Sequence, residues 1–385
     1  MKYKLFFAVL IGLSLLNPLT MLGHAELPRR DNRLRSPTEP IGLVYSGGSY
    51  PIPGAEEKTA PKIPETLSNL FAAAITPCGC ADDAANIQQA LDALPLTGGS
   101  VYLRAGIYLL NQGIHIKRSN VTLLGETGTL LQLGPNVNQP VVLIGSDVET
   151  PTPNDIIQNI RIGYMEIDGN KANQISENVP AKTWIRNNGV DVRGVAYLWV
   201  ENMNVHNARS GGIVVSWFSQ RITISNSSFH DNFFDGIALY DSKNILISNF
   251  FSYANSSAGL SLDANLEYVS LFGGYVADND IGVFIRNAMN VNLNNIMVFG
   301  NRKYGSYLAI VQGLFFQGCG FYNNKGHGIW LESTVPGSNN AVVGCLFSNN
   351  GGNCIQDDTG GGLAQTANIC PSGRSVLNFL RRFIK

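Results

Sequence analysis

The sequence predicts an all-β fold, a single-domain right-handed parallel β-helix with a capping helix at its N-terminal end. The first observation is a fixed period, since glycines recur every 23 or 24 residues through the second half of the 385-residue chain. They are Gly189, Gly212, Gly236, Gly259, Gly282, Gly305 and Gly328. The second observation is the apolar, variable, apolar pattern that follows most of them, as in residues 282–285 (Gly-Val-Phe-Ile). A period of about 20 to 50 residues is typical of a repeat architecture.

Residues 1–25 are typical of a secretory signal peptide. Two lysines precede an apolar run over residues 5–16, and small residues follow at 23–25. The run is short for a membrane span and Pro18 follows it, so we expect cleavage after export rather than an uncleaved membrane anchor. The predicted location is secreted, periplasmic or at the cell surface, with no stable membrane insertion.

Three further segments follow. Residues 26–75 are predicted to be a proline-rich linker, and residues 76–371 the β-helix. Residues 372–385 form a basic amphipathic tail, which is expected to cap the last coil, with membrane binding as the alternative. Ordered structure is expected to begin near Asp82 and Asp83, at the start of a helix. That helix would plug the open first coil with one apolar face, composed of Ile87, Ala90, Leu91 and Leu94.

The composition limits the partners and the metal chemistry. The net charge is −1 and 14% of residues are charged, which excludes the electrostatic footprint of a nucleic-acid binder. After export, the six cysteines would be in an oxidising compartment, where disulfides form. Cys319 and Cys345 are expected to stack on neighbouring coils. Cys354 and Cys370 could tie down the C-terminal end, whereas residues 78–80 (Cys-Gly-Cys) are spaced too closely for an ordinary disulfide. No histidine lies at zinc-ligand spacing from a cysteine, so no structural metal site is expected.

A polar residue recurs four positions before the residue that opens each repeat strand. The predicted members are Asn232, Asn255, Asp278, Asn301, Asn324 and Asn350. Asparagine tolerates a left-handed turn, and its amide can bond to the equivalent group one coil away. We interpret this set as a structural ladder.

Residues 82–355 resemble the pectate-lyase-like superfamily of parallel β-helices. The motifs that carry the resemblance are Asp82-Asp83, Gly98-Gly99, residues 101–103 (Val-Tyr-Leu), Ala105-Gly106, Tyr108 and residues 168–170 (Asp-Gly-Asn). The closest pattern within it is the catalytic module of mannuronan C5-epimerases, to which residues 230–232 (His-Asp-Asn) and 235–236 (Asp-Gly) add. The resemblance implies a carbohydrate substrate, catalysis on the glycine-led sheet and a plausible calcium ion.

This chain departs from the epimerase pattern at its catalytic strand. That strand carries Tyr, Gly, Phe, Asp, Pro and His in the family, whereas residues 211–216 read Gly-Gly-Ile-Val-Val-Ser. The family's basic residue after Asp-Gly-Asn would correspond to Lys182, in a loop over residues 170–184 that could overhang the cleft. A catalytic centre, if present, must therefore lie elsewhere on the sheet.

Side chains two and four positions after each glycine are expected to face solvent, because residues alternate along a strand. Four positions after the glycine, successive coils carry Tyr240, Asp263 and Arg286 in one column, with neighbours about 4.8 Å apart. These three are the predicted catalytic residues. Arg286 would hold a sugar carboxylate, and Tyr240 or Asp263 would serve as base or acid. The alternative is a surface ladder in which Asp263 and Arg286 form an ion pair.

Phe284, Tyr307 and Trp330 stand two positions after the glycine on successive coils. Such a strip can bind the apolar faces of sugar rings, or it can be a stabilising stack. The other predicted substrate-binding residues are His327, Glu332, Lys182, Asp191 and Arg193.

These observations predict an exported protein that acts on an extracellular polysaccharide. Lyase or C5-epimerase chemistry on a uronic-acid polymer is favoured, with no required cofactor and with calcium as an option. The alternatives are a glycoside hydrolase or transglycosylase and a non-catalytic carbohydrate-binding or surface-structural β-helix. Hydrolysis is disfavoured because Asp263 and Glu332 lie three coils apart, and two carboxyl groups are needed within about 5 to 9.5 Å.

Overall fold

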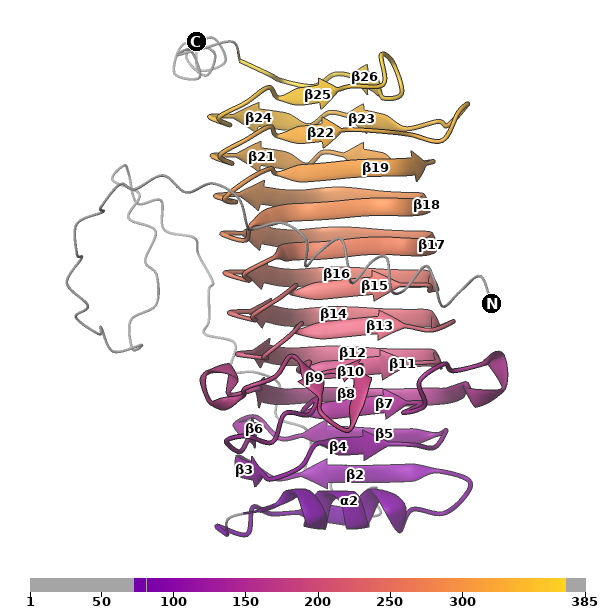
Figure 1. The fold of residues 1–385 in the computed structure, drawn as a ribbon, viewed down its shortest axis with the longest axis vertical. Coiled ribbons are helices and arrows are strands. Elements are labelled where there is room, and N and C mark those ends of the chain that lie inside the picture. Colours follow the sequence, from indigo (N-terminus) through magenta and orange to yellow (C-terminus); the bar gives the residue numbers. More distant parts are fainter. Residues whose placement is uncertain (1–72, 81, 372–385) are drawn as a thin grey trace, which may run out of the picture. The chain divides into compact units, whose positions relative to one another are not determined.

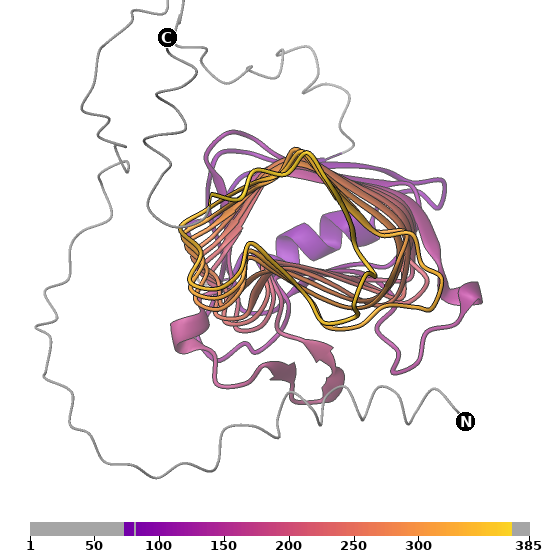
Figure 2. The same cartoon turned by 90° about the horizontal axis from the view of Figure 1, so that it is seen from above.

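A computed structural model describes residues 73–80 and 82–371, and they form a stack of β-coils (Figure 1). The predicted fold class is confirmed. Within these residues, every strand except β9 and β10 belongs to one continuous sheet of 24 strands, and all the pairings of that sheet are parallel. Viewed along the stack, successive coils lie over one another (Figure 2). None of the helices among the described residues has the length and apolar character to cross a membrane.

The elements follow the order expected for a coil repeated along the chain. The first are β1 (Ala73–Ile75), α2 (Ala84–Asp92), β2 (Gly99–Leu103), β3 (Gly106–Leu110), β4 (Ile114–Ile116), β5 (Val121–Gly125), β6 (Thr129–Leu133), β7 (Val142–Gly145), β8 (Ile157–Asp168), β9 (Asn178–Val179), β10 (Lys182–Arg186), β11 (Val190–Arg193) and β12 (Val195–His206). They continue with β13 (Ile213–Ser216), β14 (Gln220–His230), β15 (Ile237–Tyr240), β16 (Lys243–Tyr253), β17 (Ala258–Ala277), β18 (Ile281–Phe299), β19 (Ser306–Gln312), β20 (Phe315–Gln317), β21 (Gly320–Tyr322), β22 (Ile329–Leu331), β23 (Ala341–Val343), β24 (Leu346–Ser348), β25 (Ile355–Asp357) and β26 (Ala364–Thr366). Two short 3-10 helices span Pro153–Asp155 and Lys171–Asn173.

The core is a column of aliphatic side chains inside the coils. Three positions after each repeat glycine, successive coils place a residue with no exposed surface, namely Val192, Val215, Leu239, Leu262, Ile285, Leu308 and Leu331. Each fully buried aliphatic side chain contributes about 1.5–3 kcal/mol relative to an exposed one. The spacing of these positions therefore holds the coils in register.

The repeat glycines are required by the close approach of the next coil. A Cβ atom on Gly259 would lie 2.6 Å from the Asn279 Nδ2 atom and 2.9 Å from the Gly282 carbonyl oxygen. A Cβ atom on Gly236 would meet the Asn255 Nδ2 atom at 2.6 Å. The glycine period and the asparagine ladder therefore depend on each other, because the asparagine amide of the next coil occupies the space that a side chain at the glycine position would need.

The asparagine ladder is confirmed, with one wrong member. The amide and backbone nitrogens of Asn255 both donate to the Asn279 Oδ1 atom at 3.0 Å, and Asn279 donates in turn to Asn301. The predicted member Asp278 is instead exposed, with φ of 57°. Asn279 stands three residues before Gly282, whereas the other members stand four residues before their glycine. A turn that is one residue shorter on that side moves the ladder position.

The helix α2 covers the first coil, as predicted (Figure 2). Ile87, Leu91 and Leu94 are buried against the coil, at exposures of 5% or less. The predicted start of order was too late, because β1 pairs with β2 before the helix begins, which also shortens the expected linker over residues 26–75. The predicted signal peptide, most of that linker and the tail over residues 372–385 lie outside the described residues.

The cysteines form two disulfides among the described residues. Cys354 is bonded to Cys370, which ties down the last coil as expected, and Cys319 and Cys345 are buried thiols. Cys78 is bonded to Cys80, so the expectation that this spacing was too short is wrong. Gly79 lies between them with φ of 64°, a left-handed turn that brings the two Cα atoms to 5.1 Å.

Candidate functional site

The predicted column of Tyr240, Asp263 and Arg286 is present on β15, β17 and β18. Tyr240 pairs in register with Asp263, and Asp263 with Arg286. Arg286 holds Asp263 through a two-pronged ion pair, with Nε to Oδ1 at 3.1 Å and Nη2 to Oδ2 at 2.6 Å. The hydrogen bonds that Arg286 donates to Asp263 raise the pKa of the Arg286 guanidinium. The cation is therefore already neutralised, and the Asp263 carboxylate is buried at 4% exposure.

Tyr240 is a proton donor in this arrangement. Its hydroxyl donates to the Asp235 Oδ2 atom at 3.3 Å. Burial, with the nearby Asp235 charge, raises the pKa of the phenol far above its ordinary range. Burial also raises the pKa of Asp235, whose Oδ1 atom accepts the Ala258 backbone N–H at 2.9 Å. A phenol with a raised pKa stays protonated near neutral pH, so it cannot act as a base there, and it is a weaker acid than an ordinary tyrosine.

Not every position expected to face solvent does so. Two or four positions after a repeat glycine, the residues Asp191, Arg193, Ser216, Ala238, Ser261, Asp263 and Ala309 are buried at 6% exposure or less. Most of these side chains are short, and larger neighbours on adjacent coils shield them, as Phe284 does beside Ser261. Alternation along a strand determines which face a side chain lies on, whereas neighbouring side chains and loops determine whether it reaches solvent.

Arg193 holds the overhanging loops in place. Its guanidinium donates to three backbone carbonyl oxygens, those of Ser146 at 2.9 Å, Trp184 at 3.2 Å and Val148 at 2.7 Å. The loop predicted to overhang the sheet contains the antiparallel hairpin of β9 and β10. Arg193 therefore links this hairpin to the loop after β7. Its guanidinium is buried, so it is not available to bind a substrate.

Asp191 and Lys182 are also engaged by the protein. Burial raises the pKa of Asp191 to about 6, against the opposing effect of nearby Arg193. Lys182 forms an ion pair with Asp147, and the hydrogen bond from Lys182 lowers the pKa of that carboxyl. Of the three residues assigned to this end of the sheet, Arg193 and Lys182 thus stabilise the loops, and Asp191 is buried.

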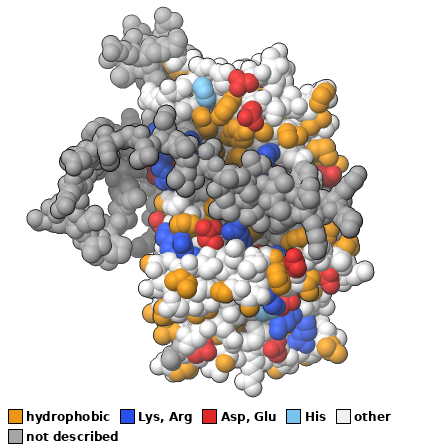
Figure 3. Space-filling model, in the orientation of Figure 1, with side chains coloured by type: hydrophobic (Ala, Val, Ile, Leu, Met, Phe, Trp, Pro, Cys, Tyr) orange, Lys and Arg blue, Asp and Glu red, His pale blue; other side chains and the backbone are white. Residues whose placement is uncertain are grey.

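Phe284, Tyr307 and Trp330 form a continuous surface on β18, β19 and β22, which we call the aromatic strip. Phe284 stacks on Tyr307 at 5.3 Å between ring centroids, and Tyr307 meets Trp330 edge to face at 5.2 Å. All three rings are partly exposed. Hydrophobic side chains gather there beside acidic side chains and a histidine on the upper coils (Figure 3).

Two further aromatic residues extend the strip along its edge. Tyr304 lies 4.9 Å from Trp330 and stacks on His327 at 5.9 Å. The sequence contained a signal for Tyr304, because it precedes Gly305 as His327 precedes Gly328. The predicted position of His327 beside Trp330 is confirmed, with a centroid distance of 6.3 Å.

Two exposed carboxylates border the strip. The Tyr307 hydroxyl donates to Glu332 Oε2 at 2.5 Å, and the Trp330 indole N–H donates to Asp358 Oδ2 at 2.8 Å. Hydrogen bonds from Gln356 and Trp330 lower the pKa of Asp358. Leu331 pairs in register with Asp357, so Glu332 and Asp358 follow at matching positions on adjacent coils.

Asp358 could have been found by counting. It stands four positions after Cys354, which takes the place of the repeat glycine on that coil. Among the described residues, the one group of at least three His, Cys, Asp or Glu ligand atoms close enough for a metal is Cys78, Cys80 and Asp83. Its two sulfur atoms are bonded to each other, so this group does not fit a metal ion.

Comparison with known proteins supports the fold. The A-module of mannuronan C-5 epimerase AlgE4 from Azotobacter vinelandii is 19% identical, with a TM-score of 0.56 over 77% of this chain and 95% of that one. Pectate lyase Pel9A is 13% identical, with a TM-score of 0.50 over 77% and 80%. The tailspike protein of Acinetobacter baumannii phage AM24 is 14% identical, with a TM-score of 0.55 over 79% of this chain and 55% of that one.

No protein of curated function matches the chain in sequence. The family described as the right-handed beta helix region matches residues 105–270 and 270–369. These two segments contain the column, the aromatic strip and both bordering carboxylates. The chain belongs to the right-handed β-helix family.

Proposed function

We propose that this protein binds an extracellular polysaccharide along the aromatic strip. The observation that carries the proposal is the alignment of Phe284, Tyr307 and Trp330 on three adjacent coils, where all three residues are partly exposed. Aromatic rings on a flat sheet present an apolar surface that matches the C–H faces of sugar rings. Three rings in register offer contacts to several consecutive sugars of one chain.

The bordering carboxylates supply the polar part of such a site. Glu332 and Asp358 are hydrogen-bond acceptors, and each is oriented by one residue of the strip. Sugar hydroxyls are donors, so these oxygens can fix the orientation of a ring that the aromatics hold. Because Tyr307 and Trp330 both stack and orient, loss of either ring removes two kinds of contact.

Lyase or C5-epimerase chemistry at Tyr240, Asp263 and Arg286 is the finer form of this proposal. Such a reaction needs a cation for the sugar carboxylate, a base for the C5 proton and an acid. The column contains the required types of side chain, and Tyr240, which stays protonated near neutral pH, is left with the acid role, in which its raised pKa is a disadvantage. The pairing of Arg286 with Asp263 weakens the other two roles, so we place binding before this chemistry.

Hydrolysis is a second candidate, and the position of Asp358 favours it. Glu332 and Asp358 sit on coils about 4.8 Å apart, which is compatible with the carboxyl spacing of a glycoside hydrolase. The hydrogen bonds to Asp358 favour its ionised form, as a nucleophile or base requires. This pair removes the geometric objection that the distance between Asp263 and Glu332 had raised.

A binding panel tests the proposal. The full chain is incubated with alginate, polygalacturonate, glycosaminoglycans and neutral plant polysaccharides, and bound protein is measured by co-sedimentation or calorimetry. Trp330→Ala should reduce the affinity for the bound polymer about tenfold or more, because it removes a ring and the partner of Asp358. Tyr307→Phe is the matched control, since it retains the ring and should keep most of the affinity.

The same incubations separate the chemistries. Absorbance of unsaturated uronates reports a lyase, new reducing ends without that absorbance report a hydrolase, and altered C5 configuration reports an epimerase. Repeats with added calcium and with a chelator test the calcium option, and the N-terminus of the exported protein tests signal cleavage. Wild-type affinity in Trp330→Ala would reject the strip as the binding surface.

A further inference from the structure

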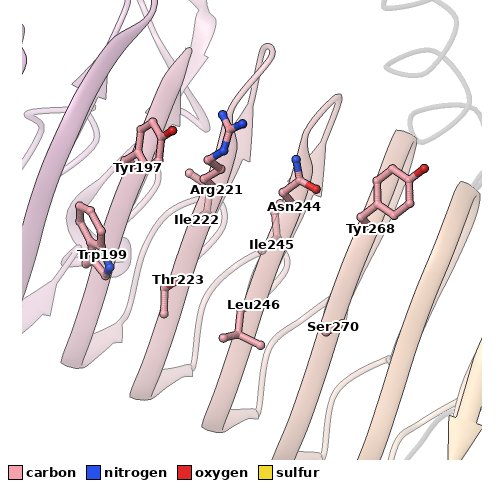
Figure 4. A pocket seen from close by; sticks show the side chains of 10 residues that line it. All are labelled: Tyr197, Trp199, Arg221, Ile222, Thr223, Asn244, Ile245, Leu246, Tyr268 and Ser270. Carbon is pink, nitrogen blue, oxygen red and sulfur yellow. The ribbon is translucent and has the colours of Figure 1, made fainter.

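A shallow groove lies on β12, β14, β16 and the second half of β17, away from the strip on β18, β19 and β22 (Figure 4). Its prominent side chains are Tyr197, Trp199, Arg221, Asn244 and Tyr268. The exposed fractions of the three aromatic residues are large, at 37% for Tyr197, 43% for Trp199 and 55% for Tyr268. Large aromatic side chains in contact with water at one place on a protein indicate a binding surface.

The groove follows a corner at which the coils turn through a left-handed residue. At this corner most coils place a residue that tolerates positive φ, namely Gly98, Asn120, Asn159, Asn244, Asn290 and Gly313. Three coils differ, with Tyr197 at φ 54°, Arg221 at 56° and Tyr268 at 57°. All three line the groove.

Tyr197, Arg221 and Tyr268 are residue types that disfavour the left-handed conformation found at this corner. A left-handed conformation costs a residue with a Cβ atom about 1–2 kcal/mol, and asparagine and glycine bear that cost best. Tyr197, Arg221 and Tyr268 therefore stabilise the turn less than the residues of the neighbouring coils would. Strain of this kind concentrates at functional sites, where side-chain chemistry rather than turn stability decides the residue.

The chemistry of the groove fits an anionic sugar chain. The Arg221 guanidinium lies 5.1 Å from the ring centroid of Tyr197, and this cation–π contact orients the guanidinium. Of the ten described residues that line the groove, none is Asp or Glu, so the Arg221 charge has no carboxylate partner there. The fork of an arginine matches a carboxylate, Asn244 adds an amide, and the aromatic rings offer stacking faces.

We propose that this groove is a second carbohydrate site, which binds an oligosaccharide containing uronic acids. Arg221 pairs with a sugar carboxylate, and Tyr197, Trp199 and Tyr268 stack on the rings. The site goes beyond the function proposed for the aromatic strip, whose borders carry carboxylates and not an unpaired cation. It does not depend on the strip, and separate substitutions test the two.

The direct test replaces Tyr197, Arg221 and Tyr268 by asparagine, the residue that most neighbouring coils have at this corner. In the full chain, Arg221→Asn and the double variant Tyr197→Asn with Tyr268→Asn are compared with Asn159→Gly, at the same corner outside the groove. Calorimetry with oligogalacturonate should show a loss of about tenfold or more in affinity for the groove variants. Their melting temperature should equal or exceed that of the wild type, because asparagine relieves the left-handed strain.

The outcomes distinguish this site from the strip. Retained oligogalacturonate binding in Trp330→Ala, with loss in Arg221→Asn, would support the groove. Equal affinity of all the groove variants and the wild type would overturn the proposal, as would an equal affinity of the wild type for a neutral oligosaccharide of the same length. Loss of binding in Trp330→Ala alone would assign the ligand to the strip.

Discussion

At the scale of single residues, the side chains that looked free in the sequence are largely engaged by other side chains or by backbone. Arg286 is paired with Asp263, Arg193 holds three backbone carbonyls and Lys182 is paired with Asp147. A sequence shows which groups can share a coil position, but the backbone carbonyls that Arg193 binds lie in loops that are 9, 45 and 47 residues away in the chain. These contacts could not be predicted from the repeat.

Asp191 leads to a prediction about pH. Burial raises its pKa to about 6, from an ordinary value near 3.8, so the folded state holds a proton that the unfolded state releases. Its contribution to stability is present below about pH 4 and is lost as the pH rises through about 6. Asp191→Asn should therefore raise the free energy of unfolding by about 3 kcal/mol above pH 7, with a much smaller effect near pH 4.

Thermal denaturation of the two proteins at several pH values measures this effect. The amide of the variant can still accept the backbone hydrogen bond that the carboxylate accepts from Arg186. A difference in melting temperature that does not change between pH 4 and pH 7 would contradict a raised pKa at Asp191.

At the scale of elements, the glycine-led strand and the asparagine ladder act together. The sequence period predicted the strands, their faces and five of the six ladder positions, because each depends on local spacing. It misplaced the ladder at Asp278, since a turn one residue shorter leaves the glycine step unchanged. Burial of Asp191 and Arg193 depends on loops outside the repeat, including the hairpin of β9 and β10 just before them, and the repeat spacing does not predict such contacts.

Asn279 is expected to be among the most sensitive positions of the turn. It has no exposed surface, and its Oδ1 atom accepts two hydrogen bonds from Asn255. Asn279→Ala should lower the free energy of unfolding by about 2–5 kcal/mol, because buried donors lose their partner. Asp278→Asn is the matched control, and its effect should stay within about 0.5 kcal/mol. Chemical denaturation measures both free energies of unfolding, and an equal decrease in the two variants would contradict the assignment of the ladder position to Asn279.

At the scale of the whole molecule, an open stack of coils must close its ends. The α2 helix does so at the N-terminal end, and the disulfide between Cys354 and Cys370 ties down the last coil described. The sequence predicted both, because an amphipathic helix before a repeat array and cysteines after it have few other roles. It could not predict β1, whose three residues carry no repeat signal.

The cap can be tested by a charge on its buried face. Ile87→Asp places an unpaired carboxylate against the first coil and should destabilise the fold by more than about 3 kcal/mol. The exposed Gln89→Asp substitution on the same helix should leave stability within about 0.5 kcal/mol. Melting temperature and size-exclusion chromatography record the result, and equal behaviour of the two variants would mean that α2 does not close the coil.

The function of the molecule depends on whether the aromatic strip is occupied by sugar. The most direct measurement is a crystal structure of the protein soaked with an oligosaccharide of the polymer that it binds. We expect sugar rings stacked along Phe284, Tyr307 and Trp330, with hydroxyl groups within hydrogen-bond distance of Glu332 or Asp358. Sugar bound only on other faces of the coils, with the strip empty at saturating oligosaccharide, would contradict that expectation.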